Sequence, residues 1–155
     1  ALGNRSILCD ASDPNINQKL NQKLNRSEFM PFAPITLEDN FESFYQDYTS
    51  TKSNLPFMTS TLNVKAKMMK EAPASVHIDE TARPQLIDKK MYSDLYKILI
   101  EYKHLTGKSN LINTSFNMHE EPIVCNADDA IRAFISSNLP FIAINEYLIE
   151  NNDAK

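Results

Sequence analysis

The sequence predicts a mixed α/β (α+β) fold, a single domain with a twisted mixed sheet flanked by helices. Residues 58–68 alternate apolar and polar side chains, which is the pattern of a half-buried strand. Residues 139–144 form a continuous apolar run, which is typical of a central strand. Segments with the apolar spacing of amphipathic helices occur at irregular intervals between these strands. The sequence therefore lacks the regular strand–helix alternation of a doubly wound sheet.

In the first half of the chain we expect a strand, a helix and an extended segment ahead of residues 58–68. The strand covers 6–9, the helix runs from Asp13 and Pro14 to about 25–26, and the extended segment covers 31–37. An aromatic face then predicts a short core helix, followed by a polar loop at 49–55. That face consists of Phe41, Phe44, Tyr45 and Tyr48.

The second half predicts a strand at 76–79 and then the longest helix, capped by Ser93 and closed by Gly107. The apolar stripe of this helix is Leu95, Ile98, Leu99, Tyr102 and Leu105. A buried strand at 110–112 follows, and Asn126 caps a further helix whose apolar positions are Ala130, Ile131, Phe134 and Ile135. The tail at 151–155 is expected to fray.

Composition excludes several classes of function. Sixteen basic and twenty acidic residues give a net charge of −4, which argues against a general nucleic-acid binder. No apolar run approaches the roughly 20 residues that span a membrane. Cys9 and Cys125 match neither a disulfide framework nor a zinc pattern, so we expect both to pack as small hydrophobes in a reducing, cytoplasmic compartment.

The chain contains two glycines, Gly3 and Gly107, which excludes a glycine-rich phosphate loop. A phosphate would therefore be held by side chains and helix ends. The best candidate is the turn after the 110–112 strand, where Asn113, Ser115 and Asn117 offer amide and hydroxyl groups without net charge. This turn suits a ribose, a neutral polar group or a phosphate oxygen. Alternatively, it is a polar turn capped by its own side chains.

Three arginines stand at expected element boundaries, Arg5, Arg26 and Arg83. The planar guanidinium suits bidentate contacts with phosphate or carboxylate, so their convergence would create an anion site. The alternative is three solvated surface arginines. His77 and Asp79 would share one face of the expected 76–79 strand, as an acid/base pair, a polar substrate wall or a structural hydrogen bond.

Several motifs occur here in the order found in the C-terminal domain of the NodU/CmcH carbamoyltransferases, and the chain resembles that domain over nearly its whole length. They are residues 1–8, 32–34, 77–79 with 81–85, 106–107, 113–117 and 121–125. The resemblance implies a YrdC-like domain over residues 1–155. The opening without an initiator Met suggests a fragment of a longer chain, whose N-terminal Kae1-like domain would carry a metal-dependent transfer site.

The resemblance implies that such a domain combines carbamoyl phosphate with ATP to give carbamoyl adenylate and pyrophosphate. The Kae1-like domain then transfers the carbamoyl group to a hydroxyl acceptor. Mg²⁺ would accompany the nucleotide, with no metal ligand from this chain. Carried over to this sequence, the catalytic residues are Arg26, Arg83 and Ser115, and the substrate-binding residues are Arg5, Lys23, His77, Asp79, Asn113 and Asn117.

The sequence departs from the family pattern at three places. Leu24 stands where the Lys-x-Arg signature has Lys, with Lys23 beside it, and Glu80 and Glu120 replace usual glycines. A carboxylate near a triphosphate is repulsive unless a metal intervenes. Two alternatives therefore stay open: a non-catalytic nucleotide-binding or docking module of the same protein, and a threonylcarbamoyl-adenylate synthase, which shares the YrdC fold.

Overall fold

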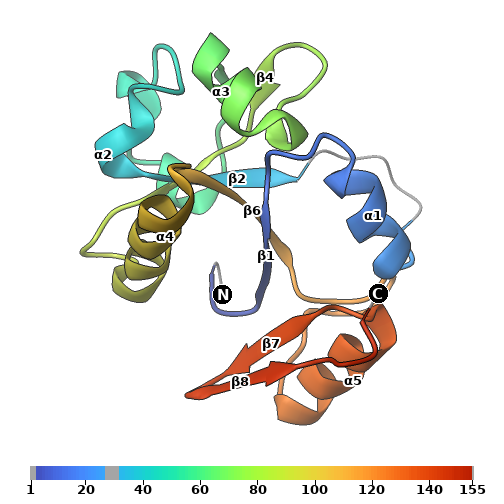
Figure 1. Cartoon of the computed structure of the whole chain (residues 1–155). Coiled ribbons are helices and arrows are strands. Elements are labelled where there is room, and N and C mark those ends of the chain that lie inside the picture. Colours follow the sequence, from blue (N-terminus) through green and yellow to red (C-terminus); the bar gives the residue numbers. More distant parts are fainter. Residues whose placement is uncertain (1–2, 27–31, 155) are drawn as a thin grey trace. The chain divides into compact units, whose positions relative to one another are not determined.

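The computed structural model describes residues 3–26 and 32–154, which form two compact units (Figure 1). The first unit comprises Ala1–Asn17 and Pro31–Thr114, and the second comprises Gln18–Met30 and Ser115–Lys155. The boundaries between the units fall inside α1 (Ile16–Lys23) and at the end of β6 (Asn110–Ser115).

A four-stranded mixed sheet organises the first unit, which confirms the predicted fold class (Figure 1). Its strand order is β1 (Ser6–Asp10), β6, β2 (Ala33–Leu37) and β5 (Gln85–Ile87). β2 is antiparallel to β6 and parallel to β5, with Ile35 opposite both Leu111 and Gln85. The predicted strands at 6–9 and 110–112 are confirmed, the second being longer than expected.

Helix α4 (Ser93–Thr106) belongs to the same hydrophobic core as the sheet. The buried cluster consists of Ile35, Leu37, Ile87, Leu95, Leu99 and Leu111. Gly107 ends the helix at φ 74°, as predicted. Ile98 and Leu105 are 51% and 84% exposed, so their core assignment was wrong, because they lie at the edge of the stripe centred on Leu95 and Leu99.

Ser93 does not cap α4, because it is already the first helical residue. The residue ahead of the helix, Tyr92, offers no side-chain cap either. The carboxylate of Asp88 accepts hydrogen bonds from the backbone N–H groups of Lys90 and Met91, at 2.8 and 2.9 Å. These groups belong to the turn before the helix, so Asp88 stabilises that turn and does not cap α4.

The predicted strand at 58–68 is wrong. The alternation of buried and exposed residues holds only around β3 (Leu62–Asn63), which pairs with β4 (Thr81–Ala82). Met58 has a left-handed φ of 57°, and α3 (Ala66–Glu71) begins after Lys65. Val64 and Met68 are both buried, a spacing of four that also fits a helix, so this part of the pattern was ambiguous.

The predicted strand at 76–79 is a turn that follows the short helix η3 (Pro73–Ser75). The backbone N–H of Glu80 donates to the carbonyl of His77 at 3.0 Å, and the N–H of His77 donates to the carbonyl of Thr81 at 2.7 Å. Glu80 has φ 60°. These two hydrogen bonds and the left-handed residue are the pattern of a turn with a G1 bulge, in which glycine normally occupies the left-handed position.

The aromatic face is buried, although its helix is shorter than predicted. α2 covers only Glu38–Phe41, and Phe41, Phe44 and Tyr45 are 0–1% exposed. The rings of Phe41 and Tyr45 stack with centroids 4.4 Å apart. The expected polar loop that follows contains two short 3₁₀ helices, η1 (Thr49–Thr51) and η2 (Leu55–Phe57).

A buried polar network ties β6 to the elements around it. Glu71 accepts a hydrogen bond from the Asn110 side chain at 2.9 Å, and Asn110 accepts one from Thr36. The Thr36 hydroxyl lies 3.0 Å from the Tyr45 hydroxyl. Since each of these side chains has a partner, the polar groups are tolerated inside the core.

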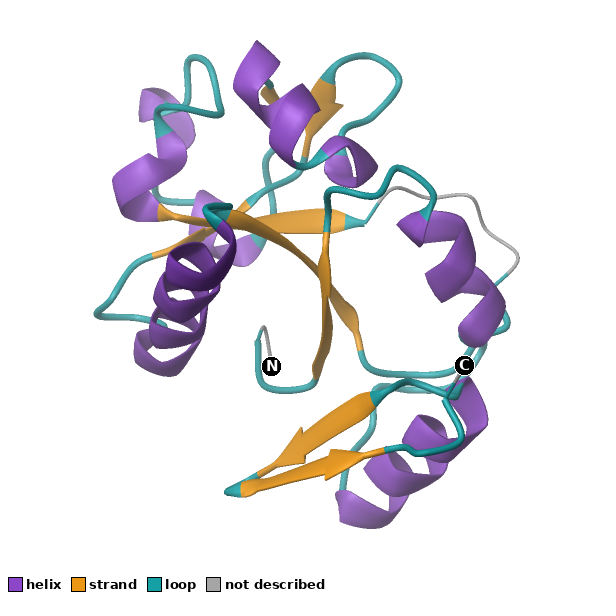
Figure 2. Ribbon diagram, viewed as in Figure 1, coloured by secondary structure: helices purple, strands orange, loops and turns teal. Residues whose placement is uncertain are grey.

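The second unit contains most of α1, helix α5 (Ala127–Ser137) and a hairpin of β7 (Phe141–Ile144) and β8 (Tyr147–Glu150) (Figure 2). The Asn126 side chain accepts from the Asp129 N–H at 2.9 Å, which confirms the predicted cap. Ala130 and Phe134 are buried as expected, whereas Ile131 and Ile135 are exposed.

The expectation that residues 139–144 form a central buried strand was wrong. Among the described residues β7 pairs only with β8, through a turn in which Asn145 has φ 54°. Ile142 is buried, but Phe141 and Leu148 are 54% and 74% exposed. The apolar run therefore places side chains on both faces of a two-stranded hairpin. Within this unit, one of these faces is exposed.

Cys9 is half-buried and Cys125 is exposed, so the expectation of a packed thiol is wrong for Cys125. In the part of the chain that the structure describes, no helix has the length and apolar character needed to cross a membrane.

Candidate functional site

The Ser-x-Asn turn at the end of β6 is held by its own side chains. The Ser115 hydroxyl donates to Asn117 Oδ1 at 2.5 Å. The Asn117 amide nitrogen donates to the carbonyls of Met118 and Glu121, at 2.9 and 3.1 Å. The side-chain orientation of both residues is thus fixed by the fold, which is the preorganisation that a binding turn needs.

Arg26 lies against this turn, also within the second unit. Asn25, at φ 55°, turns the chain after α1, and the backbone N–H of Arg26 donates to the carbonyl of Asn21 at 2.8 Å. One terminal nitrogen of its guanidinium lies 3.0 and 3.1 Å from the carbonyls of Ser115 and Asn117. The same nitrogen lies 3.1 Å from Asn117 Oδ1 and 3.5 Å from the Ser115 hydroxyl.

Burial lowers the pKa of Arg26, although a guanidinium keeps its charge at every physiological pH. The structure therefore brings together three of the predicted residues: a cation, a hydroxyl and an amide. Residues Arg26, Ser115 and Asn117 are called the Ser-x-Asn cluster below.

The neighbouring positions of α1 explain the imperfect Lys-x-Arg signature. Leu24 is completely buried and belongs to the core. The Lys23 ammonium donates to the carbonyl of Asn138 at 2.7 Å, where Asn138 is the C-terminal cap of α5. A cation suits that helix end, so Lys23 has a structural partner next to the signature.

His77 and Asp79 come together through a third residue, in a turn and not on a strand face. The Thr81 hydroxyl donates to Asp79 Oδ1 at 2.7 Å and lies 3.0 Å from His77 Nδ1. The Thr81 backbone N–H also donates to Asp79 Oδ1, at 3.1 Å. The hydrogen bond from the Thr81 side chain is the main cause that lowers the pKa of Asp79.

Sequence reasoning missed Thr81. The spacing Asp-x-Thr is that of an Asx turn, in which the Asp side chain bonds the backbone two residues on, and this signal was available.

Arg5 and Arg83 are exposed and belong to the first unit, whereas Arg26 is half-buried and belongs to the second. Arg5 precedes β1, and Arg83 follows β4. The convergence of all three arginines on one anion stays a prediction, as does the role of each in catalysis or binding.

Asn113 is 2% exposed inside the sheet, where its amide nitrogen donates to Gln85 Oε1 at 2.8 Å. It pairs with Ala33, while Gln85 pairs with Ile35, so the two amides lie over the same strand, β2. Gln85 is fully buried, and its Nε2 has no hydrogen-bond partner among the described residues. Gln85 was not among the predicted site residues, although a Gln ahead of Leu86 and Ile87 interrupts an apolar strand.

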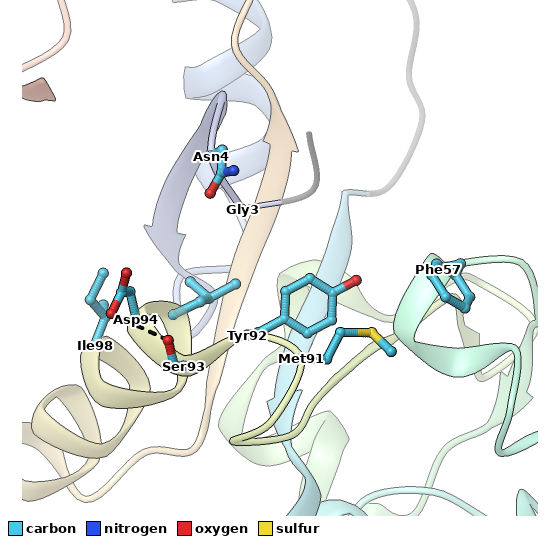
Figure 3. Close-up of a pocket in the computed structure, with 9 residues that line it drawn as sticks. Gly3, Asn4, Phe57, Met91, Tyr92, Ser93, Asp94 and Ile98 are labelled. Atoms are coloured by element: carbon cyan, nitrogen blue, oxygen red, sulfur yellow. Dashed lines mark hydrogen bonds between the residues drawn. The ribbon is translucent and has the colours of Figure 1, made fainter. Parts of the chain in front are cut away.

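A cavity of about 410 Å³ lies elsewhere in the first unit, and none of the predicted site residues line it (Figure 3). Figure 3 shows Ser93, Asp94 and Ile98 on the start of α4, with Met91, Tyr92 and Phe57 from the neighbouring segments. Gly3 also lines it at φ 85°, where a Cβ would lie 2.8 Å from Leu95 Cδ2. Glycine therefore suits this position by its left-handed conformation, and a Cβ there would require the Leu95 side chain to shift.

The chemistry of the Ser-x-Asn cluster suits an oxyanion or a nucleotide better than a metal ion. Its groups are a guanidinium, a hydroxyl and an amide, and a guanidinium cannot bind a cation. Within residues 3–26 and 32–154, no group of three or more His, Cys, Asp or Glu side chains could hold a metal ion. Any Mg²⁺ at this site would therefore take its ligands mainly from phosphate and water.

Comparison with known proteins identifies the family. A family model described as "Carbamoyltransferase C-terminus" matches residues 1–151. The chain is 33% identical over 155 residues to nodulation protein NolO of Bradyrhizobium diazoefficiens, covering 99% of the chain. It is 38% identical over 119 residues to nodulation protein U of Sinorhizobium fredii, covering 77% of the chain. An uncharacterized protein of Methanocaldococcus jannaschii is 41% identical over 149 residues, which cover 96% of the chain.

The chain spans 28% of the length of NolO and of the archaeal protein, and 21% of nodulation protein U. Among solved structures, full-length HypF in its phosphate- and nucleotide-bound form matches with a TM-score of 0.64 and 19% identity. That match covers 84% of this chain and 20% of HypF, and it supports the fold alone. With a family model matching almost every residue, this chain belongs to the carbamoyltransferases as a C-terminal domain of that family.

Proposed function

We propose that this domain forms carbamoyl adenylate from carbamoyl phosphate and ATP, for transfer to a hydroxyl acceptor by another domain of the same protein. The observation that carries the proposal is the Ser-x-Asn cluster, in a chain of the carbamoyltransferase family. The cluster places a permanent cation beside fixed hydroxyl and amide groups at the end of β6. Phosphoryl transfer depends on positioning and charge neutralisation, so this set of groups needs no protein nucleophile.

The proposed roles follow from the chemistry of each group. Arg5, Arg26 and Arg83 would hold the phosphate and carbamoyl oxygens, while Asn113, Ser115 and Asn117 would hold nucleotide phosphate or ribose. Lys23, His77 and Asp79 would contribute to the substrate-binding wall. Mg²⁺ bound to ATP would neutralise phosphate charge when present.

The balance of atoms fixes the overall reaction. Carbamoyl phosphate and ATP together contain four phosphorus atoms, and carbamoyl adenylate retains one of them. Pyrophosphate removes two, so the fourth leaves as inorganic phosphate. The oxygen count then requires one water molecule to enter. The domain must therefore separate carbamate from its phosphoryl group before, or while, the carbamate oxygen attacks the α-phosphorus of ATP and pyrophosphate leaves.

Another domain would complete the transfer to the acceptor. The relatives NolO and nodulation protein U are several times longer than this chain, so each has ample length for a further domain. We propose that a Kae1-like domain fills this role in the complete protein.

Removal of Arg83 or of the Ser115 hydroxyl tests the assignment. In the complete protein, Arg83→Ala and Ser115→Ala should each abolish ATP–pyrophosphate exchange that depends on carbamoyl phosphate. Lys97→Ala and Ser136→Ala, at exposed positions of α4 and α5, are the matched controls and should exchange normally. Unchanged exchange in both site variants would contradict the assignment of these residues.

A second candidate function is a docking module without chemistry of its own. The observation that favours it is the exposed apolar side of the β7–β8 hairpin, which includes Phe141 and Leu148. Isothermal titration calorimetry of the complete protein separates the two functions. Heat of binding with both ATP and carbamoyl phosphate supports the enzyme, whereas the absence of binding to either ligand supports docking.

A further inference from the structure

The contacts of Thr81 determine which ring nitrogen of His77 carries the proton. The Asp79 carboxylate is ionised, because hydrogen bonding to Thr81 lowers its pKa. A carboxylate only accepts hydrogen bonds, so the single hydroxyl proton of Thr81 points toward Asp79 Oδ1, 2.7 Å away. The same hydroxyl oxygen lies 3.0 Å from His77 Nδ1 and can take part there only as an acceptor.

It follows that Nδ1 of His77 is the protonated nitrogen and that Nε2 carries the lone pair in the neutral ring. In the described part of the chain, no group hydrogen-bonds to Nε2. The turn itself fixes the ring close to Thr81, since the backbone of His77 donates to the Thr81 carbonyl at 2.7 Å. His77, Thr81 and Asp79 thus form a relay that ends in a proton acceptor.

Arg83 lies on the same side of the chain as this relay. Residues i and i+2 of an extended segment point to one face, and the residue before a proline is held extended. The burial pattern agrees with this geometry, because Ala82 is completely buried while Thr81 is half-buried and Arg83 is exposed. An anion held by Arg83 therefore lies on the same face of this segment as the Thr81 side chain of the relay.

We propose that His77 Nε2 is the proton acceptor for the water that cleaves carbamoyl phosphate, and that Thr81 is the positioning residue that fixes its tautomer. The inference rests on the proposed function, which requires one water molecule in each turnover. As Nε2 takes a proton from this water, the water oxygen bonds to the phosphorus and the bond from phosphorus to the carbamate oxygen breaks. Phosphate and carbamate are the products, and the carbamate oxygen is then free to attack ATP.

The tautomer can be measured without activity. Comparison of the ¹⁵N-histidine-labelled complete protein with its His77→Gln variant assigns the ring signals of His77, because only those signals disappear in the variant. We expect protonated Nδ1 and unprotonated Nε2 in the wild type. Thr81→Val should shift the population toward protonated Nε2, whereas Thr81→Ser should keep the wild-type pattern. Protonated Nε2 in the wild type would overturn the inference.

The kinetic test separates the water-dependent step from adenylation. Phosphate release from carbamoyl phosphate should fall about 100-fold in His77→Gln, the lower end of the contribution of a general base. Phosphate release should also fall in Thr81→Val, whereas Thr81→Ser, which keeps the hydroxyl, should release phosphate at the wild-type rate. Carbamate supplied from ammonium bicarbonate bypasses this step, so carbamate-dependent ATP–pyrophosphate exchange should match wild type in Thr81→Val and Thr81→Ser. Thr61→Val, at an exposed position before β3, is the control.

Each result has one interpretation. Wild-type phosphate release in Thr81→Val and His77→Gln would contradict the relay while leaving the proposed function intact. Equal loss of phosphate release and of carbamate-dependent exchange in Thr81→Val would also contradict it, because a purely structural role affects both. A wild-type protein that catalyses neither reaction would instead contradict the proposed function, and the role of His77 as a proton acceptor would fall with it.

Discussion

Replacing Glu80 with glycine should stabilise the protein, although the change removes a side chain. Glu80 has φ 60° in the G1 position of the turn from His77 to Thr81, and a left-handed conformation costs an L-residue about 1–2 kcal/mol. Glycine removes this cost but adds unfolded-state entropy worth about 0.4–1 kcal/mol. The expected net gain is therefore about 0.8 kcal/mol, the difference between the midpoints of these ranges.

Urea unfolding of Glu80→Gly measures this gain directly. At a typical slope of about 2 kcal/mol/M, the midpoint should rise by about 0.4 M. Glu42→Gly is the matched control, because the same change of residue and charge occurs at φ −58°, where glutamate is not strained. This control should lose about 0.7 kcal/mol from unfolded-state entropy alone. A Glu80→Gly protein destabilised as much as Glu42→Gly would refute the account of the turn.

Two further predictions concern polar groups of the first unit. Burial raises the pKa of Asp10, but hydrogen bonds from Lys108 and Ser12 outweigh it and lower the pKa from 3.8 to about 2. Asp10 therefore contributes stability above pH 3.8 that is lost as the pH falls toward about 2. In Asp10→Asn the free energy of unfolding should depend less steeply on pH in this window, as measured by circular dichroism during acid unfolding. Asn113→Ala leaves Gln85 without its hydrogen bond inside the sheet and should cost about 1–3 kcal/mol in urea unfolding, and a cost near zero would show that the pair does not support the sheet.

Local signals in the sequence predicted much of the fold correctly. The Asn126 cap and the Gly107 stop each depend on a few adjacent residues, and both occur where the sequence places them. The buried strand β6 was recognisable from a short apolar segment between a helix stop and a polar turn. These features succeed because capping and backbone conformation are settled within one turn of the chain.

The errors arose where tertiary context decides. The alternation at 58–68 fits both a strand and, at Val64 and Met68, a helix, and the structure uses each over part of the segment. The apolar run at 139–144 indicated burial on two sides, but in the part of the chain that the structure describes β7 pairs with β8 alone. Neither outcome can be read from periodicity, because both depend on which other elements cover the segment.

The sequence predicted which residue types form the candidate site, but not how they are arranged in space. Ser115 and Asn117 were found from the turn itself, and the structure joins them to Arg26, 89 residues away from Ser115 in sequence. Thr81 was missed because its importance lies in bridging His77 and Asp79 within a turn, whereas the sequence indicated a strand there. The glutamates at 80 and 120 both have φ 60°, which explains why glycine suits these positions.

The most direct test of the central claim is ³¹P NMR of the complete wild-type protein mixed with carbamoyl phosphate and ATP. The proposed reaction predicts that carbamoyl adenylate, pyrophosphate and inorganic phosphate form in equal amounts as both substrates disappear. Conversion of ATP to ADP and phosphate, or persistence of both substrates, would contradict the assignment of carbamoyl adenylate synthesis to this domain.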